Sequence, residues 1–247
     1  MQFSHETNDG SPRGLGTRGG TLVIMAKAPR PGKVKTRLAR SLPVLAVTEL
    51  YRCLLDDTIL LARALDGIEV AIMCPEADVE DLVRTTGDAV PVVPQSGSGL
   101  EAGLNSAFDH FAHDGRRRVV AFNSDSPHLP ASVLESAFCA LSACDVVVGP
   151  THDGGYYLVG ATTSYPGLFH EDVMGTTNAL DSLVARARAM KLSVQLTDPF
   201  YDIDEAADLK RLAAELERAP GKAPRTANWL RTFRSAVPQT VENGGEK

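Results

Sequence analysis

Short runs of apolar residues alternate along the chain with longer segments whose apolar residues recur every three to four positions. The runs are expected to form strands at 21–27, 68–74, 89–95, 118–125, 145–150, 156–161 and 192–196. The longer segments are expected to form helices at 43–65, 77–85, 100–113, 131–141, 178–190 and 205–219, with a further helical piece around Trp229. Near-continuous apolar strands separated by helices predict an α/β fold, in which a mostly parallel sheet in three layers carries helices on both faces.

Polar sequence flanks this pattern at both ends. We expect residues 1–20 to form a disordered N-terminal tail, 21–233 a single domain, and 234–247 a disordered C-terminal tail. With 43% hydrophobic and 23% charged residues, the composition is that of a globular protein. No apolar run approaches the roughly 20 residues that span a bilayer, and the first twenty residues lack the apolar segment of a signal peptide. We therefore expect no membrane association.

The cysteines point to a reducing compartment. None of the four forms a C-x-x-C pair, and all lie in apolar segments: Cys53, Cys74, Cys139 and Cys144. Reduced, buried thiols and a cytoplasmic location are the expectation.

Positive charge is concentrated directly after the first predicted strand, although the formal net charge of the chain is −6. The stretch MAKAPRPGKVKTRLAR, 25–40, carries five basic residues within eleven positions: Lys27, Arg30, Lys33, Lys35 and Arg37. A net acidic chain with one basic loop favours a small polyanionic ligand over nucleic acid. Ligands of open α/β sheets bind beyond the carboxyl ends of the strands, where this loop lies.

The basic loop therefore predicts a site for a di- or triphosphate. Lysine supplies a point charge, arginine grips phosphate oxygens with parallel donors, glycine permits a tight turn and threonine adds a hydrogen bond. The residues assigned to this site are Lys27, Gly32, Lys35, Thr36 and Arg37. The loop is not a P-loop, because G-x-x-x-x-G-K-[ST] is absent, and the alternative interpretation is a solvated basic loop.

Carboxylates at two later positions are candidate metal ligands. Asp125 ends the apolar strand of VVAFNSDSPHLP, 119–130, where it is placed to hold Mg²⁺ or Mn²⁺ beside a polyphosphate. Asp202 or Asp204, in FYDIDEAADL, would supply a second ligand. The alternative is that these aspartates cap the helices that follow them.

A third signal is HDGGYYLVG, 152–160. Asp153 precedes two glycines, so that the backbone can approach a ligand closely. Asp153 can hydrogen-bond sugar hydroxyls, orient an acceptor or ligate a metal. The competing interpretation is structural, because Asp-Gly is also a common hairpin turn.

Taken together and in this order, KAPRPGKVKTRLA, NSDSPHLP, GPTHDGGYYLVG and YDIDEAADL resemble the bacterial glycosyltransferases of the DUF2064 group. That group has the GT-A nucleotide-diphospho-sugar transferase fold, and some members are linked to arsenosugar biosynthesis. More distantly, the chain resembles 2-phospholactate guanylyltransferase. The resemblance implies that Lys27, Lys35 and Arg37 contact phosphates, that Asp125 and Asp204 bind the metal, and that Asp153 lies on the sugar or acceptor side.

Several functions follow from these features. The first is an Mg-dependent glycosyltransferase that takes a nucleotide-sugar as donor and a small molecule as acceptor, with Asp125, Lys35 and Asp153 as the catalytic residues. The second is a nucleotidylyltransferase that joins an NTP to a phosphorylated small molecule and releases pyrophosphate. A dinucleotide-dependent oxidoreductase would use the glycines of SGSGLEAGL, but it leaves the basic loop unexplained. A non-catalytic nucleotide-binding role and a homodimer also remain open.

Overall fold

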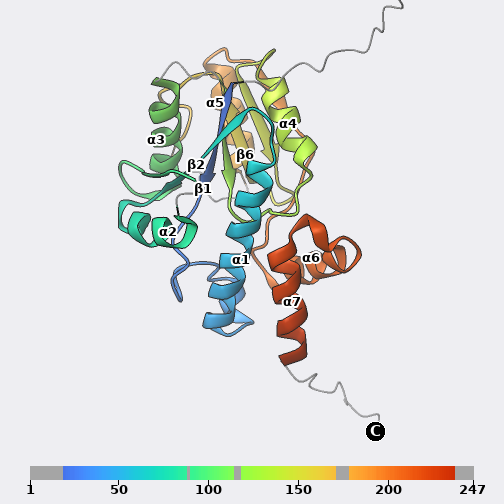
Figure 1. Cartoon of the computed structure of the whole chain (residues 1–247). Helices are drawn as coiled ribbons and strands as arrows, with labels where there is room; N and C mark the ends of the chain where they lie inside the picture. Colours follow the sequence, from blue (N-terminus) through green and yellow to red (C-terminus); the bar gives the residue numbers. More distant parts are fainter. Residues whose placement is uncertain (1–18, 88–89, 114–117, 171–177, 237–247) are drawn as a thin grey trace, which may run out of the picture.

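The strands of the chain form one sheet in the order β3-β2-β1-β4-β6-β5-β7. Figure 1 shows this sheet with helices around it. The computed structural model describes residues 19–87, 90–113, 118–170 and 178–236. The strands in chain order are β1 (Gly20–Met25), β2 (Ile68–Cys74), β3 (Val92–Pro94), β4 (Val119–Asn123), β5 (Val146–Pro150), β6 (Tyr156–Ala161) and β7 (Val194–Leu196). The mostly parallel sheet predicted from the apolar runs is therefore confirmed.

Helices connect the strands. The α-helices are α1 (Val44–Arg63), α2 (Val79–Thr86), α3 (Gly99–His113), α4 (Ala131–Ala140), α5 (Ala179–Ala189), α6 (Ala206–Arg218) and α7 (Pro224–Ala236). Single 3-10 turns occur at η1 (Leu38–Arg40), η2 (Glu76–Asp78) and η5 (Pro220–Lys222). The third strand is shorter than predicted. Pro91 directly precedes it and Pro94 is its last residue, and neither can donate to the ladder.

Strand direction fixes where a ligand binds. Strands β3, β2, β1 and β4 pair in parallel, and β6 alone among the described strands runs antiparallel, between β4 and β5. The chain leaves β1 toward β2 on one side, whereas β4 lies on the other side of β1. The order of strands reverses at this point, so the carboxyl ends of β1 and β4 flank the crevice in which α/β sheets bind ligands.

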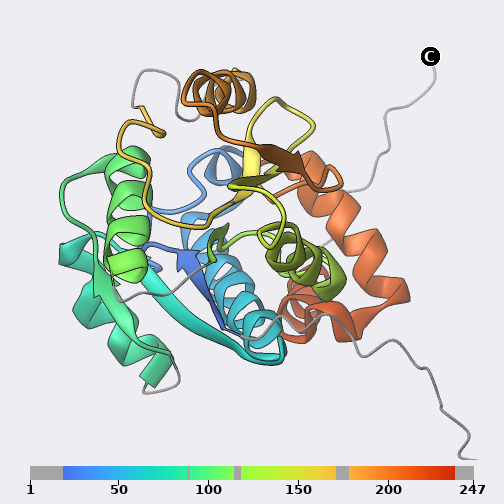
Figure 2. The ribbon, with the colours of Figure 1, turned by 90° about the horizontal axis from the view of Figure 1, so that it is seen from above.

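Both faces of the sheet are covered, as Figure 2 shows from above. One apolar cluster joins the sheet to α1 and α4, through Leu55 and Ile59 of the first and Leu134 and Phe138 of the second. The other joins the opposite face to α3 and α5. Each face of the central strands is thereby removed from water, which explains why their sequences are apolar at nearly every position.

A third apolar cluster lies beyond the edge of the sheet. The first half of α1 packs against α6 and α7 through residues that include Leu50, Leu54, Leu212 and Leu216, together with Ile203 of the segment before α6. One buried carboxylate helps to fix this arrangement: Asp57 of α1 accepts hydrogen bonds from the backbone N–H groups of Arg225 and Thr226 at the start of α7. The C-terminal helices thereby hold the segment before α6 against the rest of the fold.

The remaining expectations have mixed outcomes. The predicted tails, 1–20 and 234–247, lie almost wholly outside the described residues and stay predictions, as does the assignment of 21–233 to one domain. All four cysteines are free, but Cys74 alone is fully buried and Cys139 is exposed, so the prediction of buried thiols was wrong for Cys139. None of the helices in the described part of the chain has the length and apolar content that crossing a bilayer needs.

Candidate active site

A pocket of about 630 Å³ opens at the carboxyl ends of β1 and β4. One wall is the basic loop, with Lys27, Lys33, Lys35, Thr36 and Arg37. The facing wall is formed by the tips of β2 and β3 and the start of α3, and includes Met73, Pro75, Gln95 and the residues Gly97 to Leu100. Asp125 and Asp204 lie at the same opening. A larger cavity of about 770 Å³ between α6 and α7 is mostly apolar and contains none of the predicted site residues.

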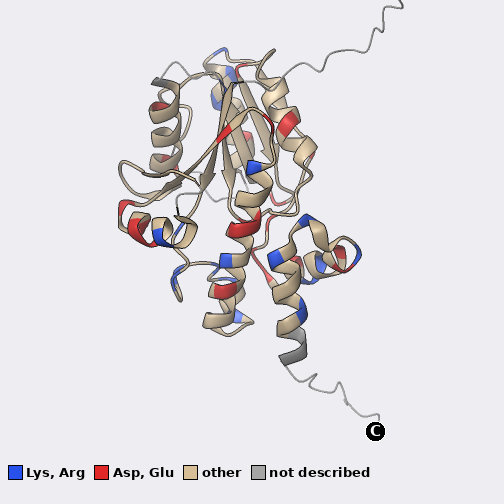
Figure 3. Cartoon of the chain, in the orientation of Figure 1, with Lys and Arg blue, Asp and Glu red and all other residues tan. Residues whose placement is uncertain are grey.

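Within the lining of this pocket, a lysine joins the two predicted metal ligands. Lys35 Nζ lies 2.5 Å from Asp125 Oδ2 and 2.8 Å from Asp204 Oδ1, and its side chain is 4% exposed. Arg37 reaches Asp204 Oδ2 at 3.3 Å from the open side. The acidic oxygens of Asp125, Asp202 and Asp204 lie within 4.8 Å of one another. We call these five residues the inner cluster. Figure 3 shows the charged residues along the ribbon.

Charge and burial act strongly on this inner cluster. Burial alone would lower the pKa of Lys35, but the attraction of Asp125 and Asp204 exceeds that effect and raises the pKa, so the ammonium is fully charged. Burial, followed by repulsion from Asp204, raises the pKa of Asp202 to about 6. The backbone of Lys35 has a φ of +48°, in the left-handed region that non-glycine residues rarely enter. A strained lysine held in a crowded group of carboxylates is typical of a functional site.

Two loops bring the carboxylates together. In the loop that follows β4, Ser126 Oγ donates a hydrogen bond to the carbonyl of Tyr201, and this contact is buried. Asp125 does not cap α4, which begins after Pro130 without a side-chain cap. Asp204 does not cap α6 either, because Asp208 Oδ2 accepts the N–H groups of Asp204 and Glu205 there. Both aspartates are therefore free of the capping role that the sequence left open.

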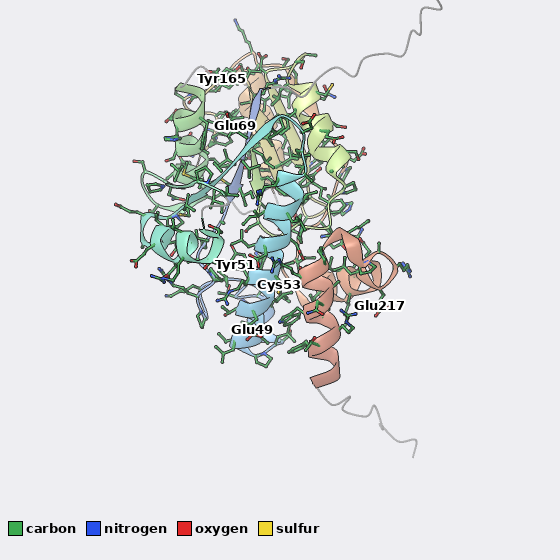
Figure 4. All side chains as sticks on the ribbon, in the orientation of Figure 1. Glu49, Tyr51, Cys53, Glu69, Tyr165 and Glu217 are labelled. Atoms are coloured by element: carbon green, nitrogen blue, oxygen red, sulfur yellow. The ribbon has the colours of Figure 1, made fainter. Side chains whose placement is uncertain are left out.

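A chain of hydrogen bonds that the sequence did not reveal holds Asp125 through the oxygen that does not contact Lys35. The backbone N–H of Lys27 donates to Tyr51 Oη at 3.1 Å, and Tyr51 Oη and Ser124 Oγ are 3.0 Å apart. Ser124 Oγ donates in turn to Asp125 Oδ1 at 2.9 Å. Burial, with a further effect of Asp125, raises the pKa of Tyr51 to about 12, so the phenol keeps its proton. Figure 4 labels Tyr51 on α1; a tyrosine at a buried helix position is the only signal the sequence offered.

Arg30 belongs to a different group. Its guanidinium donates to Asp81 and Asp78 at 2.7 and 2.8 Å and to the carbonyl of Ala77 at 2.7 Å. Asp78 also accepts the backbone N–H of Ala28 at 3.0 Å. We call Arg30, Asp78 and Asp81 the outer cluster. It ties the basic loop to α2 and does not line the pocket.

The other predicted phosphate contacts lie apart from these ion pairs. Lys27 and Thr36 line the pocket and are exposed, so both side chains are available to a ligand. Gly32 does not line the pocket. With a φ of +72° it turns the loop between the outer and the inner cluster, a conformation that suits glycine.

Asp153 lies in the turn between β5 and β6, outside the pocket. Its Oδ1 accepts hydrogen bonds from Thr151 Oγ1 at 2.5 Å and from the backbone N–H of Gly155 at 3.2 Å. The hydrogen bond from Thr151 is the main reason that the pKa of Asp153 is lowered, and the charge of Arg37 contributes a little. Asp153 therefore shapes the hairpin, as the structural interpretation held, and its exposed carboxylate also lies within electrostatic range of the inner cluster.

The donor set of the inner cluster fits a hard divalent cation. Magnesium prefers carboxylate oxygens and keeps positions for phosphate and water. Three carboxylates converge here, and two of them, Asp125 and Asp204, line a pocket with one basic wall. Burial is the main reason that the pKa of Asp202 is raised, and repulsion from Asp204 and Asp125, which such a cation would relieve, adds to it.

Comparison with known proteins supports the resemblance seen in the sequence. Residues 58–176 match the family model described as "Uncharacterized protein conserved in bacteria (DUF2064)", so the predicted resemblance to that family is confirmed. A search of curated proteins finds no match. Among solved structures, one from Desulfovibrio desulfuricans G20, provisionally assigned as a nucleotide-diphospho-sugar transferase, is similar with 27% identity and a TM-score of 0.81, over 88% of this chain and 96% of that one.

More distant structures share the fold. The CMP:2-keto-3-deoxy-manno-octonic acid synthetase complexed with CTP is 12% identical, with a TM-score of 0.54 over 81% of this chain and 99% of that one. The 4-diphosphocytidyl-2C-methyl-D-erythritol synthase from Anaerococcus prevotii DSM 20548 is 13% identical, with a TM-score of 0.52 over 81% and 97%. These likenesses confirm the predicted α/β architecture of the GT-A, nucleotide-diphospho-sugar transferase type.

Proposed function

We propose that this chain, which matches the DUF2064 family over residues 58–176, is a transferase that uses a nucleotide-activated donor, and that the donor is a nucleotide-sugar. The observation that carries the proposal is the pocket itself, in which basic side chains share one opening with Asp125 and Asp204 at the reversal of strand order, and Asp202 lies beside those two. The similarity to the Desulfovibrio structure supports the same class of donor.

The basic wall binds and orients the diphosphate. Lys27, Lys33 and Arg37 are exposed along the pocket, so their charges attract the phosphates without first breaking buried contacts. Arg37 presents a planar fork that suits phosphate oxygens. Fixing the diphosphate on this wall would hold the bond to the sugar in one orientation, which is a large part of catalysis by positioning.

Asp125 and Asp204, with Asp202 beside them, would hold the Mg²⁺ or Mn²⁺ ion. When bound, such an ion neutralises the negative charge of the leaving diphosphate. Tyr51 and Ser124 keep Asp125 in position, because Ser124 donates to one carboxylate oxygen and leaves the other directed at the inner cluster.

Asp153 is proposed to act on the acceptor side. Its lowered pKa keeps the carboxylate ionised at neutral pH, and the turn uses one of its oxygens. The other oxygen is then free to accept a hydrogen bond from an acceptor hydroxyl and to orient it. The acceptor is a small molecule, and a cytoplasmic location suits a nucleotide-sugar.

Nucleotidyl transfer is the second candidate, and the charge of the pocket favours it. Four basic residues line the cavity, which suits a triphosphate at least as well as a diphosphate. In that reaction the same wall would neutralise the departing pyrophosphate while an acceptor phosphate attacks.

A nucleotide panel separates these possibilities. We expect the thermal midpoint of the protein to rise with a nucleotide-sugar in the presence of Mg²⁺, and transfer of the sugar to follow once an acceptor is found. Pyrophosphate release from an NTP, dependent on a phosphorylated acceptor, would replace glycosyl transfer with nucleotidyl transfer. No stabilisation by any nucleotide, with or without Mg²⁺, would contradict both.

A further inference from the structure

The ammonium of Lys35 occupies the space between two residues that would hold the metal. Lys35 Nζ lies within hydrogen-bond distance of one oxygen of Asp125 and one of Asp204, and its side chain is almost completely buried. A divalent ion bound to the same carboxylates would lie within a few ångströms of this trapped positive charge. Repulsion between the two cations is strong at low solvent exposure, so the ammonium and the ion compete for the same carboxylates.

We propose that Lys35 is the resident counter-cation of the inner cluster, and that the divalent ion binds tightly only together with the polyphosphate of the nucleotide, which takes over the displaced ammonium. The substrate is then the metal–nucleotide complex rather than a nucleotide that meets a preloaded metal. This inference rests on the proposed function, because it assumes that the pocket takes a nucleotide.

The surroundings of Lys35 give the displaced ammonium a place to go. Lys35 lines the same pocket as Lys33 and Arg37, on the wall assigned to phosphates. Its four-carbon stem is flexible, so the ammonium can leave the carboxylates without moving the backbone. Free metal offers the ammonium no new anionic partner, whereas polyphosphate does. Metal and polyphosphate therefore favour each other's binding, and linkage makes this effect reciprocal.

The outer cluster provides a comparison within the same loop, because its ion pairs have a purely structural role. Arg30 pairs with two carboxylates, it is partly exposed, and it lies outside the pocket. Lys35 also pairs with two carboxylates, but it is buried and lines the pocket. A third carboxylate, Asp202, lies beside its partners without an ion pair of its own in the described part of the chain. A cluster with one carboxylate more than its lysine bridges is suited to exchange its cation.

The test measures metal binding directly. Free Mn²⁺ is titrated into the nucleotide-free protein and followed by the loss of its electron paramagnetic resonance signal, for the wild type, Lys35→Met and Lys33→Met. The last variant removes the same charge from the same wall without touching a carboxylate. We expect Lys35→Met to bind free Mn²⁺ about tenfold tighter than wild type, and Lys33→Met to change the affinity by less than about threefold.

The preformed Mn²⁺–pyrophosphate complex is then titrated into the same proteins. Here the expected sign is opposite: Lys35→Met binds the complex about tenfold more weakly, because the ammonium that would contact phosphate is missing. A merely structural lysine would not give this pair of opposite changes, since loss of folding weakens both equilibria.

Equal free-Mn²⁺ affinity in wild type and folded Lys35→Met would overturn the inference, and so would weaker binding in the variant. If Lys35→Met does not fold, the wild type decides: pyrophosphate must tighten Mn²⁺ binding about tenfold or more, and an absence of coupling overturns the inference. Failure of the proposed function looks different. In that case neither pyrophosphate nor any nucleotide binds, while the free-Mn²⁺ comparison still reports on Lys35.

Discussion

Two cations of the basic loop, Arg30 and Lys35, lie five residues apart in the sequence, and each one bridges a pair of carboxylates. The two arrangements differ in their role. In the outer cluster, Arg30 bridges Asp78 and Asp81 at the surface, with a side chain that is 42% exposed. In the inner cluster, Lys35 bridges Asp125 and Asp204 with a side chain that is 4% exposed. Both clusters contain a cation between two carboxylates. They differ in how far the cation is buried and in whether the cluster lines a cavity.

This difference teaches that an ion pair is not in itself a sign of function. An exposed pair contributes little, because water screens it and ordering two side chains costs entropy. A buried pair is stabilising only when its geometry and hydrogen bonds are good, and removal of one partner leaves an unpaired charge. The inner cluster keeps three carboxylates close together at the mouth of a pocket, an arrangement that stability alone does not require.

The test with the largest expected effect replaces one carboxylate of each cluster by alanine. We expect Asp125→Ala to lower transferase turnover by about 10³-fold, because it removes a ligand of the metal that stabilises the leaving group. Its free energy of unfolding should change by less than about 3 kcal/mol, since Lys35 keeps Asp204 as a partner. The measurements are steady-state kinetics and urea unfolding.

Asp81→Ala in the outer cluster is the matched control and should keep turnover within about twofold of wild type. Equal losses in both variants would show that the two clusters do not differ in function.

A second test compares two arginines of the same loop. Arg37→Met should raise the KM for the nucleotide about tenfold, because a charge-assisted contact to phosphate is lost. Arg30→Met should leave the KM within about twofold, since Arg30 points at α2 and not into the pocket. If the two variants show the same KM, the division of the basic loop into a structural and a ligand-binding half is wrong.

Acid should destabilise the fold through His128, which lies in the loop that also carries Asp125 of the inner cluster. This histidine follows Asp125 in the same loop and packs against Phe200 and Tyr201, and in the described structure neither ring nitrogen has a hydrogen-bond partner. Burial, with smaller effects of Lys222 and Arg211, lowers its pKa to about 3. The unfolded chain binds the proton near pH 6.5, so the free energy of unfolding should fall by up to about 1.4 kcal/mol per pH unit from there down to about pH 3.

His128→Leu should remove this slope and keep the stability at pH 7 within about 1.5 kcal/mol of wild type. The exposed His110 provides the control, because His110→Leu should retain the slope. Urea unfolding at several pH values measures both, and a His128→Leu protein with an unchanged slope would contradict the assignment.

Much of the fold follows from local pattern. Strands such as β1 and β4 are apolar at nearly every position because helices cover both of their faces, and this pattern is visible without coordinates. The antiparallel direction of β6 is not visible, because a strand buried between two others has the same apolar sequence in either direction.

The site was harder to predict from the sequence than the fold. Asp125 stands out because it follows a parallel strand almost directly, and Lys35 stands out because it belongs to the basic loop after β1. The sequence does not separate Arg30 from Lys35, since their partners lie 48 to 51 and 90 to 169 residues away and are chosen by tertiary packing. Tyr51 was missed for a related reason: its hydroxyl meets Ser124 only because α1 packs across the tips of the strands.

The reversed strand β6 has an evolutionary consequence. Because β5 and β6 form a hairpin, the whole of the Asp153 turn is five residues, Thr151, His152, Asp153, Gly154 and Gly155, and the strands on either side are held by sheet pairing. On the proposed role of Asp153 toward the acceptor, substitutions in so short a turn would change which hydroxyl compound is accepted and leave the donor-binding residues of the pocket unchanged. The specificity for the acceptor could then change in evolution through this one turn, without changes elsewhere in the fold.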